Sequence, residues 1–127
     1  MVDDEATVLQ FFAAVLAEDG YFVTIAASGR HALLLLRDTE FELIVLDMSL
    51  PDVDGVELIR QLRVDFPHVK VVAVSGFMGR SLRDAATSAG AVGTLGKPTT
   101  PTELRRAIYC ALDTSLSWHG TENKKLK

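Results

Sequence analysis

Residues 44–55 of this chain read Ile-Val-Leu-Asp-Met-Ser-Leu-Pro-Asp-Val-Asp-Gly, and this stretch decides the fold. Together with Leu43, its first three residues form a purely apolar run, which predicts a strand buried on both faces. The run ends at Asp47, and Pro51 and Gly55 then mark a loop before a helical pattern begins. In a parallel sheet, a carboxylate directly after a buried strand lies at the edge where functional sites form.

Helical and strand patterns alternate on both sides of this stretch. Amphipathic spacing, caps and glycine or proline stops predict helices at residues 6–18, 29–37, 56–64, 81–89 and 101–112, with Asp4 and Ser28 as caps of the first two. Clusters of β-branched, aromatic or aliphatic residues predict strands at residues 21–26, 43–46, 69–74 and 92–95. Such βα repeats with short connections predict an α/β domain, a parallel sheet with helices on both faces.

Composition limits the possible classes of function. The chain has 127 residues, 48% of them hydrophobic, which is enough for one folded domain and excludes wholesale disorder. Its net charge of −4 argues against a dedicated nucleic-acid binder. Cys110 is the single cysteine, so an intrachain disulfide and a cysteine-rich metal site are excluded. The aliphatic runs are too short for a membrane span, and the acidic start is unlike a signal peptide.

Residues 113–127 break the alternating pattern. They contain Trp118, His119 and the ending Lys-Lys-Leu-Lys. We therefore expect a domain over residues 1–112 and a tail over residues 113–127 outside it, either a loose end or a cut linker to a further domain.

Polar residues of defined chemistry follow the predicted strands. Asp3 and Asp4 follow the short start of the chain, Asp47 follows residues 43–46, Ser75 follows residues 69–74 and Lys97 follows residues 92–95. Three acids at one edge repel each other unless a hard divalent cation such as Mg²⁺ lies between them. A carboxylate held there can act as a nucleophile toward a phosphoryl group, whose oxygens an ammonium and a hydroxyl then contact.

These pieces, in their order and separation, resemble the receiver domains of two-component response regulators. The resemblance covers residues 1–112 and rests on the acidic pair in residues 2–5, on residues 44–55, on Ser75-Gly76 and on Lys97-Pro98. It implies a flavodoxin-like fold, a doubly wound five-stranded parallel sheet with strand order 2-1-3-4-5. It also implies a cis bond between Lys97 and Pro98.

The resemblance assigns a role to each site residue. Asp47 would be the phosphoacceptor, with Lys97 contacting the phosphoryl group and Ser75 as the switch hydroxyl. Asp4 would bind Mg²⁺ directly and Asp3 would act through water, and Asp47 and the backbone carbonyl of Ser49 would complete the metal ligands.

The implied function is a cytoplasmic signalling switch in a two-component system or phosphorelay. A sensor histidine kinase or a phosphotransfer protein would donate the phosphoryl group in a Mg²⁺-dependent reaction, and partner binding or homodimerisation would change. Such a domain assists its own phosphorylation and dephosphorylation but is no turnover enzyme. We expect no direct binding to nucleic acid or membrane.

Two departures from the family pattern affect this interpretation. Thr94 stands three residues before Lys97, where receivers usually carry Tyr or Phe, and a threonine cannot make the ring movement that reports phosphorylation. Only Met1 and Val2 precede the acidic pair, although the first strand is central in the implied order and strands usually have about five residues. Either this strand is truncated, or the start of the chain lies upstream of Met1.

The short first strand predicts a structural problem. Its two neighbours would lack a shared partner, and buried unpaired strand groups cost roughly 1–3 kcal/mol each. We therefore expect a destabilised chain or a gap that another segment or another chain fills.

Other functions fit the residues less well. A phosphatase of the haloacid dehalogenase type needs a second aspartate where Ser49 stands, and residues 91–98 lack the first glycine and the final hydroxyl of a P-loop. No phosphate-binding run follows the first strand, as a flavin binder would require. Asp52 and Asp54 are interpreted as turn residues. The alternative that remains is a pseudo-receiver, an interaction module without a phosphorylation cycle.

Overall fold

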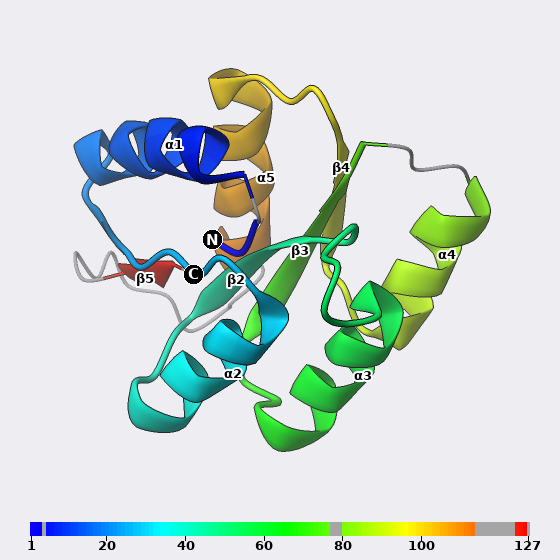
Figure 1. Cartoon of the computed structure of the whole chain (residues 1–127). Coiled ribbons are helices and arrows are strands. Elements are labelled where there is room, and N and C mark those ends of the chain that lie inside the picture. Colours follow the sequence, from blue (N-terminus) through cyan, green and yellow to red (C-terminus); the bar gives the residue numbers. More distant parts are fainter. Residues whose placement is uncertain (4, 77–79, 114–123, 127) are drawn as a thin grey trace.

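Five parallel strands form the middle layer of the molecule, and helices cover both of its faces (Figure 1). This computed structural model describes residues 1–3, 5–76, 80–113 and 124–126. The elements are α1 (Ala6–Glu18), β1 (Tyr21–Val23), α2 (Gly29–Asp38), β2 (Leu43–Asp47), α3 (Gly55–Asp65), β3 (Lys70–Ser75), α4 (Arg80–Ala89), β4 (Gly93–Gly96), α5 (Pro101–Asp113) and β5 (Lys124–Leu126).

The sheet order is β1-β5-β2-β3-β4, and every pairing is parallel. In β2 and β3 the register runs from Leu43 opposite Lys70 to Asp47 opposite Val74. Ser75 ends β3 opposite Gly96, the last residue of β4. The carboxyl ends of β2, β3 and β4 therefore meet at one edge of the sheet, as the sequence predicted.

Side chains of β2 alternate between two hydrophobic cores. Ile44 and Leu46 pack in the core beneath α2, α3 and α4, whereas Leu43 and Val45 pack in the core beneath α1 and α5. All five residues of β2 are buried. This confirms the prediction that the apolar run is a strand covered on both faces.

Hydroxyl and carboxylate side chains hold the helix starts. Ser28 is the N-cap of α2 and accepts a hydrogen bond from the backbone N–H of His31 at 3.1 Å, as predicted. Asp54 caps α3 by accepting from Val56 N at 2.9 Å and Glu57 N at 3.1 Å. The cap expected for α1 differs, because its N-cap is Glu5, without a side-chain cap hydrogen bond, and Asp4 lies outside the described residues.

The loop after β2 is tied to the start of α2. The two carboxylate oxygens of Asp52 accept hydrogen bonds from the backbone N–H groups of Gly29 and Arg30, each at 3.1 Å. Val53 packs so closely that a Cβ atom on Gly29 would lie 2.5 Å from its Cγ2 atom. Asp52 and Asp54 thus act on backbone donors, in agreement with their interpretation as turn residues.

The central strand position is shared by two segments. Val2 forms parallel bridges to Ala26 on one side and Leu46 on the other. Nearer the amino ends of the neighbouring strands, β5 occupies the same position. It pairs with β1, and its Leu126 also lies opposite Leu43 of β2. The sheet therefore has the predicted 2-1-3-4-5 arrangement, with Val2 and β5 in place of a continuous first strand.

Two details differ from the sequence-based expectation. The strand expected over residues 21–26 is shorter, because only Tyr21–Val23 forms β1 and Ala26 makes the isolated bridge. Residues 113–127 were expected outside the domain, whereas Lys124–Leu126 lies within the sheet.

In the described ranges, no helix combines the length and the hydrophobicity that crossing a membrane requires.

Candidate functional site

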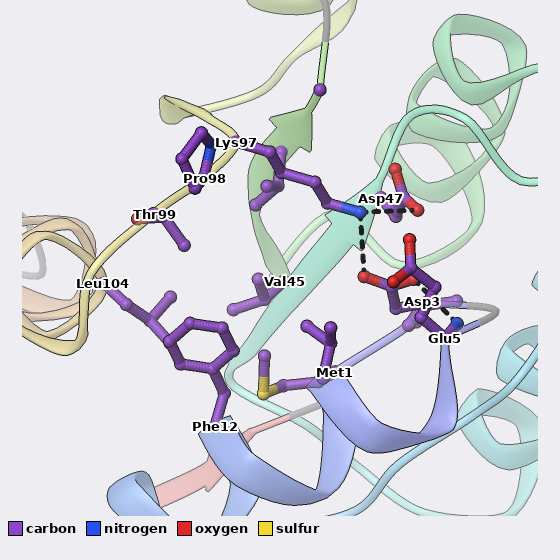
Figure 2. Close-up of a pocket in the computed structure, with 14 residues that line it drawn as sticks. Met1, Asp3, Glu5, Phe12, Val45, Asp47, Lys97, Pro98, Thr99 and Leu104 are labelled. Carbon is purple, nitrogen blue, oxygen red and sulfur yellow. Dashed lines mark hydrogen bonds and ion pairs between the residues drawn. The ribbon is translucent and has the colours of Figure 1, made fainter.

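One lysine and two aspartates from distant parts of the chain meet at the carboxyl edge of the sheet (Figure 2). Lys97 Nζ donates hydrogen bonds to Asp3 Oδ2 and to Asp47 Oδ2, each at 3.1 Å. Asp3 follows Val2 in the central strand position, Asp47 ends β2, and Lys97 follows β4. The bond between Lys97 and Pro98 is cis, as expected. The fold thus joins three of the residues that the sequence singled out.

The second oxygen of each carboxylate is also held. Asp3 Oδ1 accepts from the backbone N–H of Glu5 at 3.0 Å, and Asp47 Oδ1 accepts from the backbone N–H of Ser49 at 3.0 Å. Each donor lies two residues after its aspartate, which is the spacing of an Asx turn. Both carboxylates are therefore oriented by their own loop and by the shared ammonium.

The site carries more negative than positive charge. The side chains of Asp47, Asp3 and Lys97 are 3%, 9% and 24% exposed. Burial raises the pKa of Asp47, and the negative charge of Asp3 adds to this effect, while Ser49 N–H and Lys97 oppose it. Burial alone would lower the pKa of Lys97, but its hydrogen bonds to Asp3 and Asp47 outweigh burial and raise it. A further cation would relieve the repulsion between the two carboxylates.

Ser75 and Thr94 lie on the two strands that border this edge. Ser75 is 2% exposed and ends β3, and its backbone carbonyl accepts a hydrogen bond from Lys97 N at 2.8 Å. Thr94 of β4 lies opposite Ala73 of β3 and is partly exposed. Ser75 follows Val74, the register partner of Asp47, whereas Thr94 lies two residues before the end of β4.

The remaining predicted metal ligands are only partly placed. Ser49 is exposed, and the interaction the structure records for it is its N–H donation to Asp47. Asp4 lies outside the described residues. Within the described ranges, no three His, Cys, Asp or Glu side chains gather as a metal-binding group.

A cavity of about 430 Å³ opens beside the charged residues. Asp3, Asp47 and Lys97 line one end, and Figure 2 shows Met1, Phe12 and other apolar side chains of α1, α5 and the sheet around the rest. The charged residues therefore lie at the border between the sheet edge and an apolar interior.

Sequence reasoning missed several contacts around the site. It assigned Ser49 only a carbonyl role, although the aspartate-to-i+2 spacing is a signal for the Asx turn observed here. It did not single out Thr99, whose hydroxyl oxygen is buried without a hydrogen-bond partner in the described part of the chain. No sequence signal marks a hydroxyl as unpaired, because pairing depends on packing.

Comparison with known proteins gives consistent results. The family model of the response regulator receiver domain matches residues 1–109. The alginate biosynthesis transcriptional regulatory protein AlgB of Pseudomonas aeruginosa is 37% identical over 113 residues, covering 89% of this chain and 25% of AlgB. The KDP operon transcriptional regulatory protein KdpE of Escherichia coli is 37% identical over 112 residues, covering 88% of this chain and 49% of KdpE. The chain thus spans half or less of the length of these relatives.

A solved structure supports the same assignment. The CheY-like response regulator receiver domain protein from Methanospirillum hungatei superposes with a TM-score of 0.84 at 31% identity, covering 89% of this chain and 90% of that one. Since the family model spans nearly the whole described sheet and its charged edge, this chain belongs to the response regulator receiver domain family.

Proposed function

We propose that this chain is a phosphorylation-dependent switch whose phosphoacceptor is Asp47. The observation that carries the proposal is the position of this carboxylate, buried at the carboxyl end of β2, with one oxygen on Ser49 N–H and the other on Lys97. Receiver domains are the phosphoaccepting modules of two-component signalling, so a sensor histidine kinase or a phosphotransfer protein is the proposed donor.

The proposed reaction is a transfer between a histidine and a carboxylate. An oxygen of Asp47 attacks phosphorus, the new O–P bond forms as the N–P bond of the donor breaks, and the histidine nitrogen keeps the bonding electron pair. Lys97 lies within reach of both carboxylates and would neutralise charge on the phosphoryl oxygens. Ser49 N–H keeps the Asp47 carboxylate in one orientation.

The residues present fit a magnesium ion. Asp3, Asp4, Asp47 and the backbone carbonyl of Ser49 would hold it, and Mg²⁺ commonly uses few protein oxygens and keeps several waters. Burial raises the pKa of Asp47 and the charge of Asp3 raises it further, so a cation beside the two carboxylates would favour their ionised forms. When bound, the ion supplies positive charge that offsets the carboxylates and the phosphoryl oxygens.

The proposed output is a change in partner binding. The phosphoryl group carries a charge of about −1.5 to −2, which would replace the single charge of the Asp47 carboxylate beside Lys97, and α4 begins five residues after Ser75. The α4, β4 and α5 surface is the proposed contact for a partner or a second copy, without direct nucleic-acid binding. A cytoplasmic location completes the proposal and is supported by family membership.

Thr94 favours a second candidate function. Because no aromatic ring stands at this position of β4, the usual readout of phosphorylation cannot operate, which would suit a pseudo-receiver that binds partners without a phosphorylation cycle. The two functions differ in whether Asp47 accepts a phosphoryl group.

Intact-mass spectrometry after incubation with a small phosphodonor and Mg²⁺ tests the proposal. We expect the parent chain to gain one phosphoryl group, Asp47→Asn to gain none, and chelation by EDTA to suppress the gain. Asp38→Asn, which changes an exposed acid at the end of α2, is the matched control and should be modified like the parent. A parent chain that stays unmodified while properly folded would favour the pseudo-receiver, and modification of Asp47→Asn would place the acceptor elsewhere.

A further inference from the structure

We propose that the cavity between α1, α5 and the sheet binds a small organic cation, with an apolar body inside the core and an ammonium group beside Asp3 and Asp47. The cavity has a volume of about 430 Å³. This lies within the range of about 300–1,000 Å³ that is typical of small-molecule sites. The inference goes beyond the proposed phosphorylation switch and does not depend on it.

Four elements of the fold supply the apolar walls of this cavity. They contribute Val8 and Phe12 of α1, Val45 of β2, Val74 of β3 and Leu104 of α5. Figure 2 shows the ring of Phe12 beside Leu104. All but the partly buried Val8 are buried members of the core beneath α1 and α5. The cavity is therefore a hollow in that core, with walls built from helices and strands.

Apolar walls favour an apolar occupant over water. An ordered buried water needs about two to four polar partners, and apolar side chains offer none. An aromatic ring or a branched chain that enters such a hollow leaves water and gains dispersion contacts with the walls. The body of the ligand is therefore apolar.

The charged end of the cavity defines the group that the ligand carries. Asp3, Asp47 and Lys97 line this end, and two carboxylates with one ammonium leave a net negative charge. Lys97 Nζ already donates to both carboxylates at 3.1 Å. An anionic ligand would therefore be repelled by two acids and would find the lysine paired. An ammonium group instead supplies the positive charge that this end lacks.

The two carboxylates can accept a further donor. Within the described residues, each of their four oxygens accepts one recorded hydrogen bond. The donor to both Oδ2 atoms is Lys97, and the donors to the Oδ1 atoms are the backbone N–H groups of Glu5 and Ser49. An ionised carboxylate has about four lone-pair sites, so an ammonium group can bind while the contacts of Lys97 are kept.

Isothermal titration calorimetry in Mg²⁺-free buffer at pH 7 tests the chemistry with four probes. Phenylpropylamine has a ring and an ammonium group, phenylpropanol and phenylpropionate carry a hydroxyl or a carboxylate instead, and propylamine lacks the ring. We expect phenylpropylamine to bind one site and each other probe to bind at least about tenfold more weakly. The proposal is overturned if phenylpropylamine shows no saturable binding, or if any other probe binds as tightly.

A phenylalanine variant with a matched control locates the site. Val8 lines the cavity, so Val8→Phe fills part of the space that the ring of the probe needs. Val64 of α3 is 77% exposed and does not line the cavity, so Val64→Phe makes the same change elsewhere. Val8→Phe should weaken phenylpropylamine binding by at least about tenfold, and Val64→Phe should leave it unchanged. A folded Val8→Phe that binds like the parent would rule out this cavity.

Methyl NMR of the parent chain gives a second readout that needs no variant. Phenylpropylamine should shift the methyl signals of Val8, Val45 and Leu104, because an aromatic ring alters the magnetic field at neighbouring methyl groups. The methyl signals of Val64 should stay in place. Shifts confined to methyl groups outside the cavity walls would place the probe elsewhere and would overturn the proposal.

Discussion

Asp47 carries its charge at a cost to the fold, because burial and the charge of Asp3 raise its pKa above the ordinary value of 3.8. Between that value and the raised one, the folded state holds a proton that the unfolded chain has lost. Stability contributed by this group therefore falls as pH rises through this window. In Mg²⁺-free buffer at pH 7, Asp47→Asn should melt about 2–5 °C above the parent.

Thermal unfolding across a pH series checks this prediction. Below pH 3.8 the carboxyl group of the parent is protonated in both states, so the difference from Asp47→Asn should disappear. A variant that melts below the parent at pH 7 would mean that the ion pair with Lys97 outweighs burial and repulsion.

Two adjacent threonines give opposite predictions for the same substitution. The hydroxyl of Thr99 is buried without a partner in the described part of the chain, so Thr99→Val should raise the free energy of unfolding by about 1 kcal/mol. Thr100 Oγ1 accepts from Glu103 N at 3.1 Å at the start of α5, so Thr100→Val should lower it by about 1 kcal/mol. Urea unfolding measures both, and destabilisation by Thr99→Val would mean that its hydroxyl is hydrogen-bonded in solution.

The site residues at the strand ends could be predicted from the sequence for a physical reason. A strand pattern fixes where the strand stops, and the parallel arrangement brings the stops together, so Asp3, Asp47 and Lys97 could be expected to meet. The hydrogen bonds from Ser49 and Glu5 depend on loop conformation, which apolar periodicity does not encode. The expected roles of Ser75, Asp4 and the Ser49 carbonyl stay predictions.

At the scale of elements, α2 depends on a carboxylate from the loop after β2. Burial alone would raise the pKa of Asp52, but the backbone N–H groups of Arg30 and Gly29 outweigh it and lower the pKa. A carboxylate at a helix start accepts free backbone donors and faces the positive end of the helix dipole. Asp52→Ala should lower the free energy of unfolding by about 1 kcal/mol, and Asp52→Asn should lower it less.

The pH dependence separates this contact from simple packing. Because the folded-state pKa of Asp52 is lowered, its contribution is present above the ordinary value of 3.8 and is lost as pH falls through the lowered value. The difference in the free energy of unfolding between the parent and Asp52→Ala, measured with urea, should therefore become smaller at acidic pH. A gap that stays constant would assign the effect to packing alone.

Helices and inner strands followed from periodicity more closely than the edges of the sheet did. The helix expected over residues 6–18 is α1, and the strand expected over residues 43–46 lies within β2. The β5 strand was missed because Lys-Lys-Leu has neither alternation nor β-branched residues. Strand formation there depends on the neighbouring strands rather than on local preference.

At the scale of the whole molecule, one sheet supports two cores. The strand order could be predicted from the family resemblance. That Val2 and Leu126 share the central strand position could not be predicted, because they are related only through their pairing with neighbouring strands. Long-range pairing of this kind leaves no local pattern in the sequence.

Because both cores rest on the same strands, they should unfold together. Ile59 of α3 and Ile108 of α5 lie on opposite faces of the sheet and are 1% and 0% exposed. Ile59→Val and Ile108→Val should each cost about 0.5–1.5 kcal/mol. With no shared contact across the sheet, the double variant should lose the sum of the two to within about 0.5 kcal/mol. Val64→Ala, at a 77% exposed position of α3, is the matched control and should change stability by no more than about 0.5 kcal/mol.

Calorimetry and urea unfolding decide whether the sheet acts as a single cooperative unit. For one transition, the calorimetric and van't Hoff enthalpies agree in the parent and in every variant. A substitution in either core should destabilise the whole sheet, because β2 and β3 contribute side chains to both cores. A second transition that shifts with Ile108→Val but not with Ile59→Val would show that the layer of α1 and α5 unfolds separately from the opposite core.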